Sequence, residues 1–188
     1  MKRNKINILI VLLCFTTLLL AACNNETKES NSNDFTDCEI FMSQDLLVNC
    51  IDNTDIDAIF INSHDLTVLN IWATYCSPCI EEMPVLEKLA NEDPDNLAII
   101  GLVSDVYNMD GTINEKQLEL AESIINKVGL TYPVLLANDQ IREKLLSLIQ
   151  AVPTTLFIDS NGKVVGSKVG SMDEDTWRKT ISEYKIAK

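Results

Sequence analysis

Histidine and basic side chains are scarce in this chain. His64 is the single histidine among 188 residues, and 15 Lys and Arg face 28 Asp and Glu, which gives a formal net charge of −13. A zinc site built on a cysteine pair needs two further ligands, and His64 lies in a polar stretch typical of a solvated loop, so we expect no metal centre. The acidic balance argues against nucleic acid and anionic lipid surfaces as partners. Internal repeats are absent and the composition stays uniform after residue 36, so we expect one domain over 36–188.

Residues 1–22 have the composition of a secretory signal peptide. A basic start precedes an apolar run over 6–20, which is too short for a comfortable membrane span. The run ends in Leu20-Ala21-Ala22-Cys23, which resembles the lipobox of bacterial lipoproteins, in which the cysteine is acylated and becomes the first residue after cleavage. We therefore expect a lipid anchor on Cys23, a flexible polar tether over 23–35, and an extracytoplasmic location at the bacterial cell membrane. An ordinary signal peptide with a chance cysteine is the alternative.

Two cysteines three residues apart, Cys76 and Cys79, carry the strongest chemical signal. They follow a β-branched apolar run over 67–73, typical of a buried strand, and apolar side chains recur at helical spacing over 77–90. At such a junction the helix dipole and the first-turn N–H groups can lower a thiol pKa from roughly 8.5 toward ~7. We expect Cys76 to be the exposed nucleophile and Cys79 the buried resolving thiol, a redox-active pair that needs no other cofactor. Half of a zinc site, or a purely structural bridge, is the alternative.

Cys38 and Cys50 are left over once Cys14 is removed with the signal and Cys23 is lipidated. In an oxidising exterior, leftover cysteines usually pair, and the span 39–49 could form a hairpin that brings these two together. We expect a structural disulfide. A second redox pair, free thiols, or pairing with another chain remain open, because spacing alone does not separate them.

Runs typical of strands alternate with helical patterns along the rest of the chain. The expected strands are Asp57–Ile61, Thr67–Ala73, Asn96–Ser104, Pro133–Ala137, Thr154–Asp159 and Lys163–Val169. The expected helices are Ser77–Asn91, Asn114–Val128, Asp139–Leu148 and Glu174–Ala187. The alternation favours an α/β sheet covered on both faces, and the turn signal over 159–163 favours an antiparallel hairpin near the C-terminal edge.

Several motifs together resemble the membrane-tethered thioredoxins of the TlpA/ResA-like family. They are the signal with its Cys23 lipobox, Asn70 to Cys79, Glu82-Met83-Pro84, Val152-Pro153-Thr154-Thr155 and Asp159 to Lys163. The likeness covers roughly residues 55–188. It implies a thioredoxin-like fold with a central mixed sheet flanked by helices, an N-terminal hairpin extension, and a central insertion over 105–130.

The resemblance assigns catalytic roles to four residues. It makes Cys76 the nucleophile, Cys79 the resolving thiol, Pro153 the cis-proline beside them, and Glu82 the acid that tunes thiol ionisation and moves protons. Glu82 lies one turn after Cys79 on the expected helix, where partial burial would raise its own pKa and that of the thiols. The alternatives are a solvated glutamate, like Glu81, and an ordinary trans turn proline.

Residues around the cysteines and the proline are candidates for binding substrate. A cis Val152–Pro153 bond would offer the backbone groups of residue 152 to an extended peptide without demanding a particular sequence. Trp72 and Tyr75 are candidates to border this site, although core packing explains Trp72 equally well. The full set is Trp72, Tyr75, Ser77, Pro78, Val152 and Thr154.

Two departures from the family pattern favour a reductant. Asn70 stands six residues before the first cysteine, where plain thioredoxins place an aspartate, so Glu82 gains importance. Ile80 and Glu81 follow the second cysteine, where the family often has a basic residue, so no adjacent cation helps Cys76 to ionise. A strong oxidant needs an unusually stable thiolate, which this pattern does not favour.

The expected function is the reduction of disulfides in exported or surface proteins by a monomer. Apocytochrome c and surface methionine sulfoxide reductases are candidate clients, and a membrane electron donor of the CcdA/DsbD type is the expected source of electrons. The nearest alternative is a disulfide-forming oxidase with the same site. A non-catalytic binding or metal-delivery lipoprotein is the alternative of another class. A copper-delivery protein of the Sco kind requires a histidine after the cysteine pair, and a peroxiredoxin requires the motif Pro-x-x-x-Thr-x-x-Cys. The chain has neither.

Overall fold

The computed structural model describes Phe35 and residues 47–186. The signal peptide over 1–22, the lipid anchor on Cys23, nearly all of the tether, and Cys38 lie outside these residues and stay predictions. Phe35 is the last residue of the predicted tether, but it is buried against the core of the domain. No helix in the described ranges has the length and the apolar content to span a membrane.

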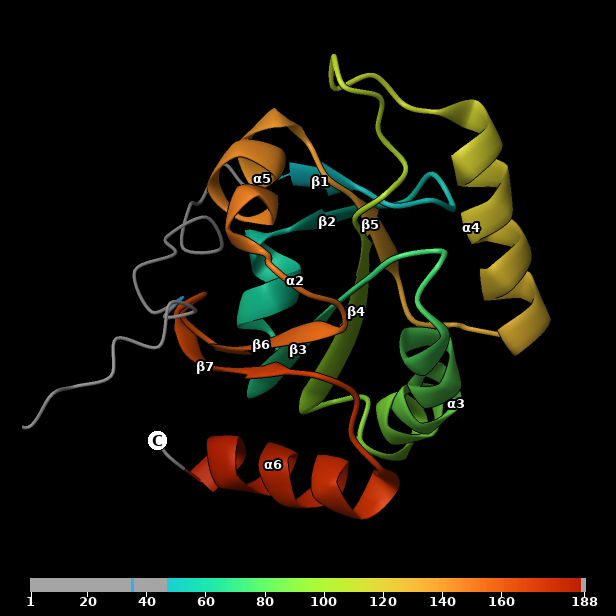
Figure 1. Cartoon of the computed structure of the whole chain (residues 1–188). Coiled ribbons are helices and arrows are strands. Elements are labelled where there is room, and N and C mark those ends of the chain that lie inside the picture. Colours follow the sequence, from blue (N-terminus) through green and yellow to red (C-terminus); the bar gives the residue numbers. More distant parts are fainter. Residues whose placement is uncertain (1–34, 36–46, 187–188) are drawn as a thin grey trace, which may run out of the picture. The chain divides into compact units, whose positions relative to one another are not determined.

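The main sheet has five strands in the order β5-β4-β3-β6-β7 (Figure 1). The central strand β3 (Leu66–Trp72) runs parallel to β4 (Leu97–Val103) and antiparallel to β6 (Thr154–Asp159). On the outer sides, β5 (Val134–Leu136) is parallel to β4, and β7 (Val164–Val169) is antiparallel to β6. The predicted mixed sheet and its C-terminal hairpin are confirmed.

Helices pack against both faces of this sheet and enclose two cores. One core includes residues of α2 (Ala58–Asn62), α5 (Asp139–Lys144) and the 3₁₀ turn η2 (Leu146–Leu148); the other includes residues of α3 (Ser77–Glu92), α4 (Glu115–Val128) and α6 (Glu174–Ile186). Side chains alternate along a strand, so Leu69 and Ile71 of β3 enter the first core while Val68 and Trp72 enter the second. By the same alternation Asn70 faces α3.

The expected strand over Asp57–Ile61 is wrong, because most of this segment is the short helix α2. Asp57 ends β2 (Asp55–Asp57), and its carboxylate accepts the N–H of Phe60 (2.9 Å), which caps the helix. Ile61 is buried while Ile59 is 76% exposed. A short apolar run cannot be assigned to helix or strand from its pattern alone, and here a cap decides it.

The expected insertion over 105–130 contains α4. Asn114 caps its first turn by accepting the N–H of Gln117 (3.2 Å). Gly129 ends it in the left-handed conformation at φ 78°, which glycine adopts without steric cost.

A two-stranded hairpin lies against the β5 edge of the main sheet. β1 (Leu47–Asn49) pairs antiparallel with β2. Ile51 N–H donates to Val134 O (2.8 Å), and Cys50 forms a bridge with Leu135. Of the span 39–49, in which a hairpin is expected, the structure describes only 47–49, which pair with β2; the remainder lies outside the described residues.

Candidate active site

Cys76 and Cys79 form a disulfide at the start of α3. Cys76 is the N-cap residue, and its Sγ accepts a hydrogen bond from the backbone N–H of Cys79 (3.2 Å). Pro78 lies in the first turn, where the N–H that it lacks has no helical partner to lose. The Cys76 sulfur therefore lies at the positive end of a helix, which stabilises a thiolate once the disulfide is reduced.

The two cysteines differ little in exposure. Cys79 is 0% exposed, as predicted, but Cys76 is only 5% exposed. The prediction of an exposed Cys76 is wrong for this oxidised form, because the residue packs in the second core with Trp72 and Met83.

A carboxylate after β4 holds the loop that precedes Cys76. Asp105 accepts the Thr74 N–H with both oxygens (3.1 Å each) and the Thr74 hydroxyl with Oδ2 (2.6 Å). Gln117 of α4 donates to the same hydroxyl oxygen (2.7 Å) and to Asp105 Oδ2 (3.0 Å). The inserted helix is thus bonded to the loop that leads into Cys76. Sequence reasoning missed Asp105, although a polar residue just after a parallel strand was a usable signal.

Glu82 is a buried carboxylate one helical turn after Cys79, with 3% exposure. Its Oε1 accepts Asn70 Nδ2–H (3.0 Å), and its Oε2 accepts the Met172 N–H (3.1 Å) and the Trp177 Nε1–H (3.3 Å). Burial raises the pKa of Glu82, and the three donors oppose this rise without cancelling it. Its burial excludes a solvated helix glutamate, and a carboxyl with a raised pKa one helical turn from a cysteine is suited to take up and return a proton.

The donors to Glu82 come from distant parts of the chain. Asn70 lies on β3 at the position where plain thioredoxins carry an aspartate, and it also donates to Thr155 Oγ1 of β6 (3.3 Å), its partner in strand register. Met172 lies in the β7–α6 loop and Trp177 on α6. Sequence reasoning missed Met172 and Trp177, because no local pattern links residues 90 and 95 positions away from Glu82.

The Val152–Pro153 peptide bond is cis, as predicted. Pro153 O accepts the N–H of Gly170 (2.8 Å). This hydrogen bond connects the loop that contains Pro153 to the residue after β7. Val152 is half-buried and packs against the core that contains both cysteines. Thr154 is 2% exposed and its hydroxyl donates to Ala151 O (2.7 Å), so its side chain is internal, and its predicted role in binding substrate stays a prediction.

Three of the predicted substrate-binding side chains lie on the surface beside the disulfide. Tyr75 is 76% exposed, and Ser77 and Pro78 are also exposed. Their contact with substrate stays a prediction. Trp72 is 0% exposed within the second core, so the expectation that it borders a peptide site is wrong and core packing accounts for it.

His64 lies at the end of α2 and is bonded locally. Its Nδ1 lies 2.8 Å from Phe60 O, and its ring lies against the Phe60 ring with centroids 4.9 Å apart. Within the part of the chain that the structure describes, no group of three His, Cys, Asp or Glu residues could hold a metal ion.

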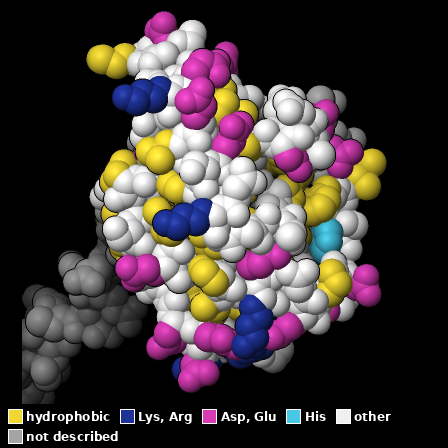
Figure 2. Space-filling model, turned by 90° about the vertical axis from the view of Figure 1, so that its right-hand side faces the viewer, with side chains coloured by type: hydrophobic (Ala, Val, Ile, Leu, Met, Phe, Trp, Pro, Cys, Tyr) yellow, Lys and Arg dark blue, Asp and Glu magenta, His cyan; other side chains and the backbone are white. Residues whose placement is uncertain are grey.

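Acidic side chains outnumber Lys and Arg on the face shown in Figure 2, in keeping with the net charge of −13.

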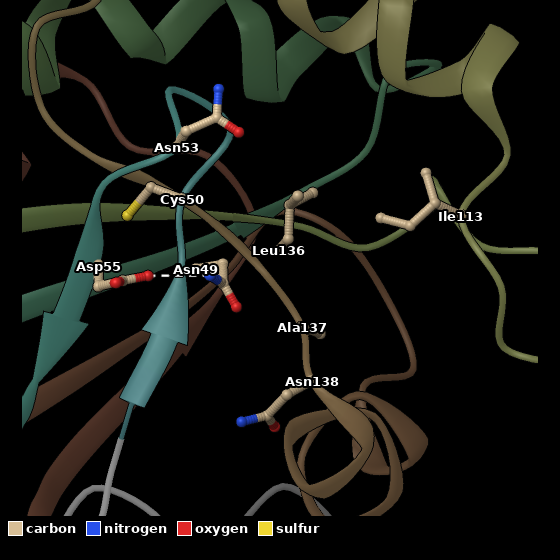
Figure 3. A pocket seen from close by; sticks show the side chains of 8 residues that line it. All are labelled: Asn49, Cys50, Asn53, Asp55, Ile113, Leu136, Ala137 and Asn138. Carbon is tan, nitrogen blue, oxygen red and sulfur yellow. Dashed lines mark hydrogen bonds between the residues drawn. The ribbon is translucent and has the colours of Figure 1, made fainter.

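Cys50 is buried at a pocket of about 400 Å³ and forms no disulfide with another described residue (Figure 3). The pocket is lined by Asn49, Cys50, Asn53, Asp55, Ile113, Leu136, Ala137 and Asn138. Burial raises the pKa of the Cys50 thiol. Its predicted partner Cys38 lies outside the described residues, so their disulfide stays a prediction.

Known proteins resemble the chain over most of this domain. The Redoxin family matches residues 52–186. Thiol-disulfide oxidoreductase ResA of Halalkalibacterium halodurans is 30% identical over 152 residues, covering 76% of this chain and 77% of ResA. Thioredoxin-like protein YneN of Bacillus subtilis is 32% identical over 105 residues, which span only 56% of either chain. The solved structure of the pneumococcal exposed lipoprotein thioredoxin Etrx1, from Streptococcus pneumoniae, has a TM-score of 0.56 and 26% identity, covering 73% of this chain and 98% of Etrx1.

Proposed function

The chain belongs to the Redoxin family and is a thiol–disulfide oxidoreductase of the TlpA/ResA kind; from this premise we propose that it reduces disulfides in exported or surface proteins. One observation carries the proposal. The Cys76–Cys79 pair opens α3 with its first sulfur at the helix N-terminus, and a buried Glu82 lies one turn beyond the second.

In the proposed reaction, the Cys76 thiolate attacks one sulfur of a client disulfide. The client S–S bond breaks, a mixed disulfide forms, and the first client sulfur leaves and takes up a proton. Cys79 then loses its proton and attacks the Cys76 sulfur, which breaks the mixed disulfide and releases the second client thiol. Two electrons pass to the client, and the protein disulfide is formed.

Glu82 supplies the base for the second step. A buried thiol holds its proton tightly, since apolar surroundings disfavour the thiolate. Cys79 is fully buried, and Glu82 follows it by one turn of the same helix. In this proposal the carboxylate takes the Cys79 proton and returns it when the pair is reduced again.

The residues around the pair support this direction of electron flow. Ile80 and Glu81 follow Cys79, so the sequence places no cation beside the thiolate. Without such a cation the reduced form gains less stabilisation, which favours a reductase over an oxidase.

The location and the partners complete the proposal. Lipidation of Cys23 would tether the domain outside the bacterial cell membrane, and Etrx1, whose name describes an exposed lipoprotein, supports such an arrangement. The clients are proposed to be apocytochrome c or methionine sulfoxide reductases, and electrons would come from a membrane donor of the CcdA/DsbD type. The protein would act as a monomer.

The equilibrium potential of the Cys76–Cys79 couple tests the direction. The chain without residues 1–23 is equilibrated in glutathione or dithiothreitol redox buffers, beside a variant with Cys38→Ser and Cys50→Ser that removes the other thiols. A value near that of thioredoxin, roughly −270 mV, supports a reductase. A value near that of the oxidant DsbA, roughly −120 mV, would identify a disulfide-forming oxidase instead.

A further inference from the structure

The carboxamide of Asn70 has a buried oxygen without a donor. Asn70 is 0% exposed, and its Nδ2 donates to Glu82 Oε1 (3.0 Å) and to Thr155 Oγ1 (3.3 Å). Its Oδ1 meets no hydrogen-bond donor among the described residues. Buried side-chain oxygens are nearly always paired, so this one calls for a physical explanation.

The two oxygens of Glu82 are not equivalent. Oε2 accepts two N–H groups, from Met172 and Trp177, whereas Oε1 accepts only Asn70 Nδ2–H. A proton on Oε2 would point a hydroxyl at two donors that cannot accept it. A proton taken up by Glu82 therefore goes to Oε1, on the side of Asn70.

A proton on Oε1 then meets the N–H of Asn70, which cannot accept it. Turning the carboxamide by half a turn replaces Nδ2 with Oδ1, which can accept the new O–H of Glu82. The Thr155 hydroxyl both donates and accepts, so it can give its proton to Oδ1 in the turned form.

We propose that Asn70 is the positioning residue for Glu82 in both protonation states, donating N–H to the carboxylate and, after its amide turns, accepting O–H from the acid. The inference rests on the proposed function, in which Glu82 takes the proton of Cys79. In that step the S–H bond of Cys79 breaks and an O–H bond forms at Oε1. No oxidation state changes. An ionised aspartate at position 70 could not serve the carboxylate form, because it has no hydrogen to donate.

Few ionisable groups face this network. α3 contributes the cysteine pair, which does not titrate while oxidised. Tyr132 precedes β5, and burial and the charges of Glu87 and Glu82 raise its pKa, so it stays a neutral phenol. Trp177 of α6 does not titrate, and Asp173, next to Met172, is exposed. In the oxidised protein, the orientation of the Asn70 amide therefore depends on the protonation state of Glu82.

Nuclear magnetic resonance of the oxidised, isotope-labelled protein tests the turn without any substitution. The ¹³Cδ shift of Glu82 follows its titration, and the Nδ2 protons of Asn70 report the amide. We expect both to change with one midpoint, and the contact between the Nδ2 protons and the Thr155 side chain to weaken at least threefold in the acid form. An amide whose contacts stay constant while Glu82 titrates would overturn the proposal.

A Glu82→Gln variant fixes the neutral state as a matched control, since an NH₂ group replaces the O–H. We expect its Asn70 amide to show the acid-form signals of the wild type at every pH. Signals of the wild-type carboxylate form would contradict the turn.

Two substitutions of Asn70 add a functional readout. In Asn70→Asp, which offers only acceptors when ionised, two carboxyls titrate as a pair, and we expect its upper midpoint to exceed that of Glu82 in the wild type. In Asn70→Leu, which offers neither donor nor acceptor, we expect reduction of glutathione disulfide to slow about tenfold while alkylation of Cys76 keeps its rate. An unchanged midpoint or rate in these variants would show a merely structural asparagine. A wild-type protein that does not reduce glutathione disulfide would count against the proposed function and leave the resonance result standing.

Discussion

Replacing Glu82 by glutamine should stabilise the oxidised protein at neutral pH and change its stability little in acid. Burial raises the folded-state pKa of Glu82 above its unfolded value of about 4.3. As pH rises, the unfolded chain therefore loses this proton first. The stability that the group confers is present below the unfolded pKa and is lost as pH rises through the folded pKa.

The pKa difference sets the size of this effect. Each unit by which the folded pKa exceeds the unfolded one costs the wild type about 1.4 kcal/mol at neutral pH, and the glutamine variant avoids this cost. Other carboxyls, such as Glu87 and Asp93 with their lowered pKa values, are common to both proteins and cancel in the comparison.

The hydrogen bonds around position 82 determine how the stabilities of the wild type and of Glu82→Gln compare at low pH. The glutamine carbonyl can still accept the hydrogen bonds from the N–H groups of Met172 and Trp177. Its NH₂ group then faces Asn70. If the Asn70 amide turns, the two proteins should match at pH 4. A fixed amide would leave buried N–H groups facing each other and cost the variant about 1–3 kcal/mol at every pH.

Urea unfolding of both proteins with the disulfide intact, from pH 4 to pH 8, measures the difference. We expect the advantage of the variant to grow with pH and then level off above the folded pKa of Glu82. A difference that stays constant across this range, or that shrinks as pH rises, would refute the account of Glu82 as a buried carboxyl with a raised pKa.

Three further predictions follow from other contacts. Cys79→Ser should trap client proteins as mixed disulfides on Cys76, visible on non-reducing gels, and a variant in which both Cys76 and Cys79 are serine should trap none; equal amounts of adduct in Cys76→Ser and in Cys79→Ser would contradict the assignment of Cys76 as the nucleophile. Asp105→Ala should lower the free energy of unfolding by about 1.5–3 kcal/mol, because Thr74 loses a charged partner, and Asp105→Asn should lose less; equal unfolding midpoints in denaturant would argue against this clamp. Gly129→Ala should cost about 1 kcal/mol, because a left-handed residue ends α4, and an unchanged melting temperature would contradict that.

The fold follows from the sequence wherever the signal is local. The β-branched run before Cys76 and the helical spacing after it place the cysteines at the start of α3, and the turn signal over 159–163 places the β6–β7 hairpin. The pattern fails over 57–61, where one capping contact from Asp57 outweighs an apolar run too short to have a period of its own.

The candidate site is predictable only in part, since much of it depends on contacts between distant segments. Motif spacing singles out Cys76 and Cys79 as candidates, and the family resemblance adds Glu82. The bond from Trp177 to Glu82 joins residues 95 positions apart, and the clamp of Asp105 on Thr74 joins residues 31 apart. Burial also has to be seen in three dimensions, because an aromatic residue beside the cysteines can be internal, as Trp72 is, or external, as Tyr75 is.

The hairpin of β1 and β2 has a consequence for how the molecule behaves in a crowded solution. An uncovered edge strand is a template on which another chain can add a strand, and this is a common start of aggregation. Here residues 50 and 51 bond to the β5 edge, whereas no described strand pairs with the outer side of β7, which has Lys168 near its end. A chain trimmed back to residue 58 would uncover β5 and should precipitate at concentrations that the longer chain tolerates.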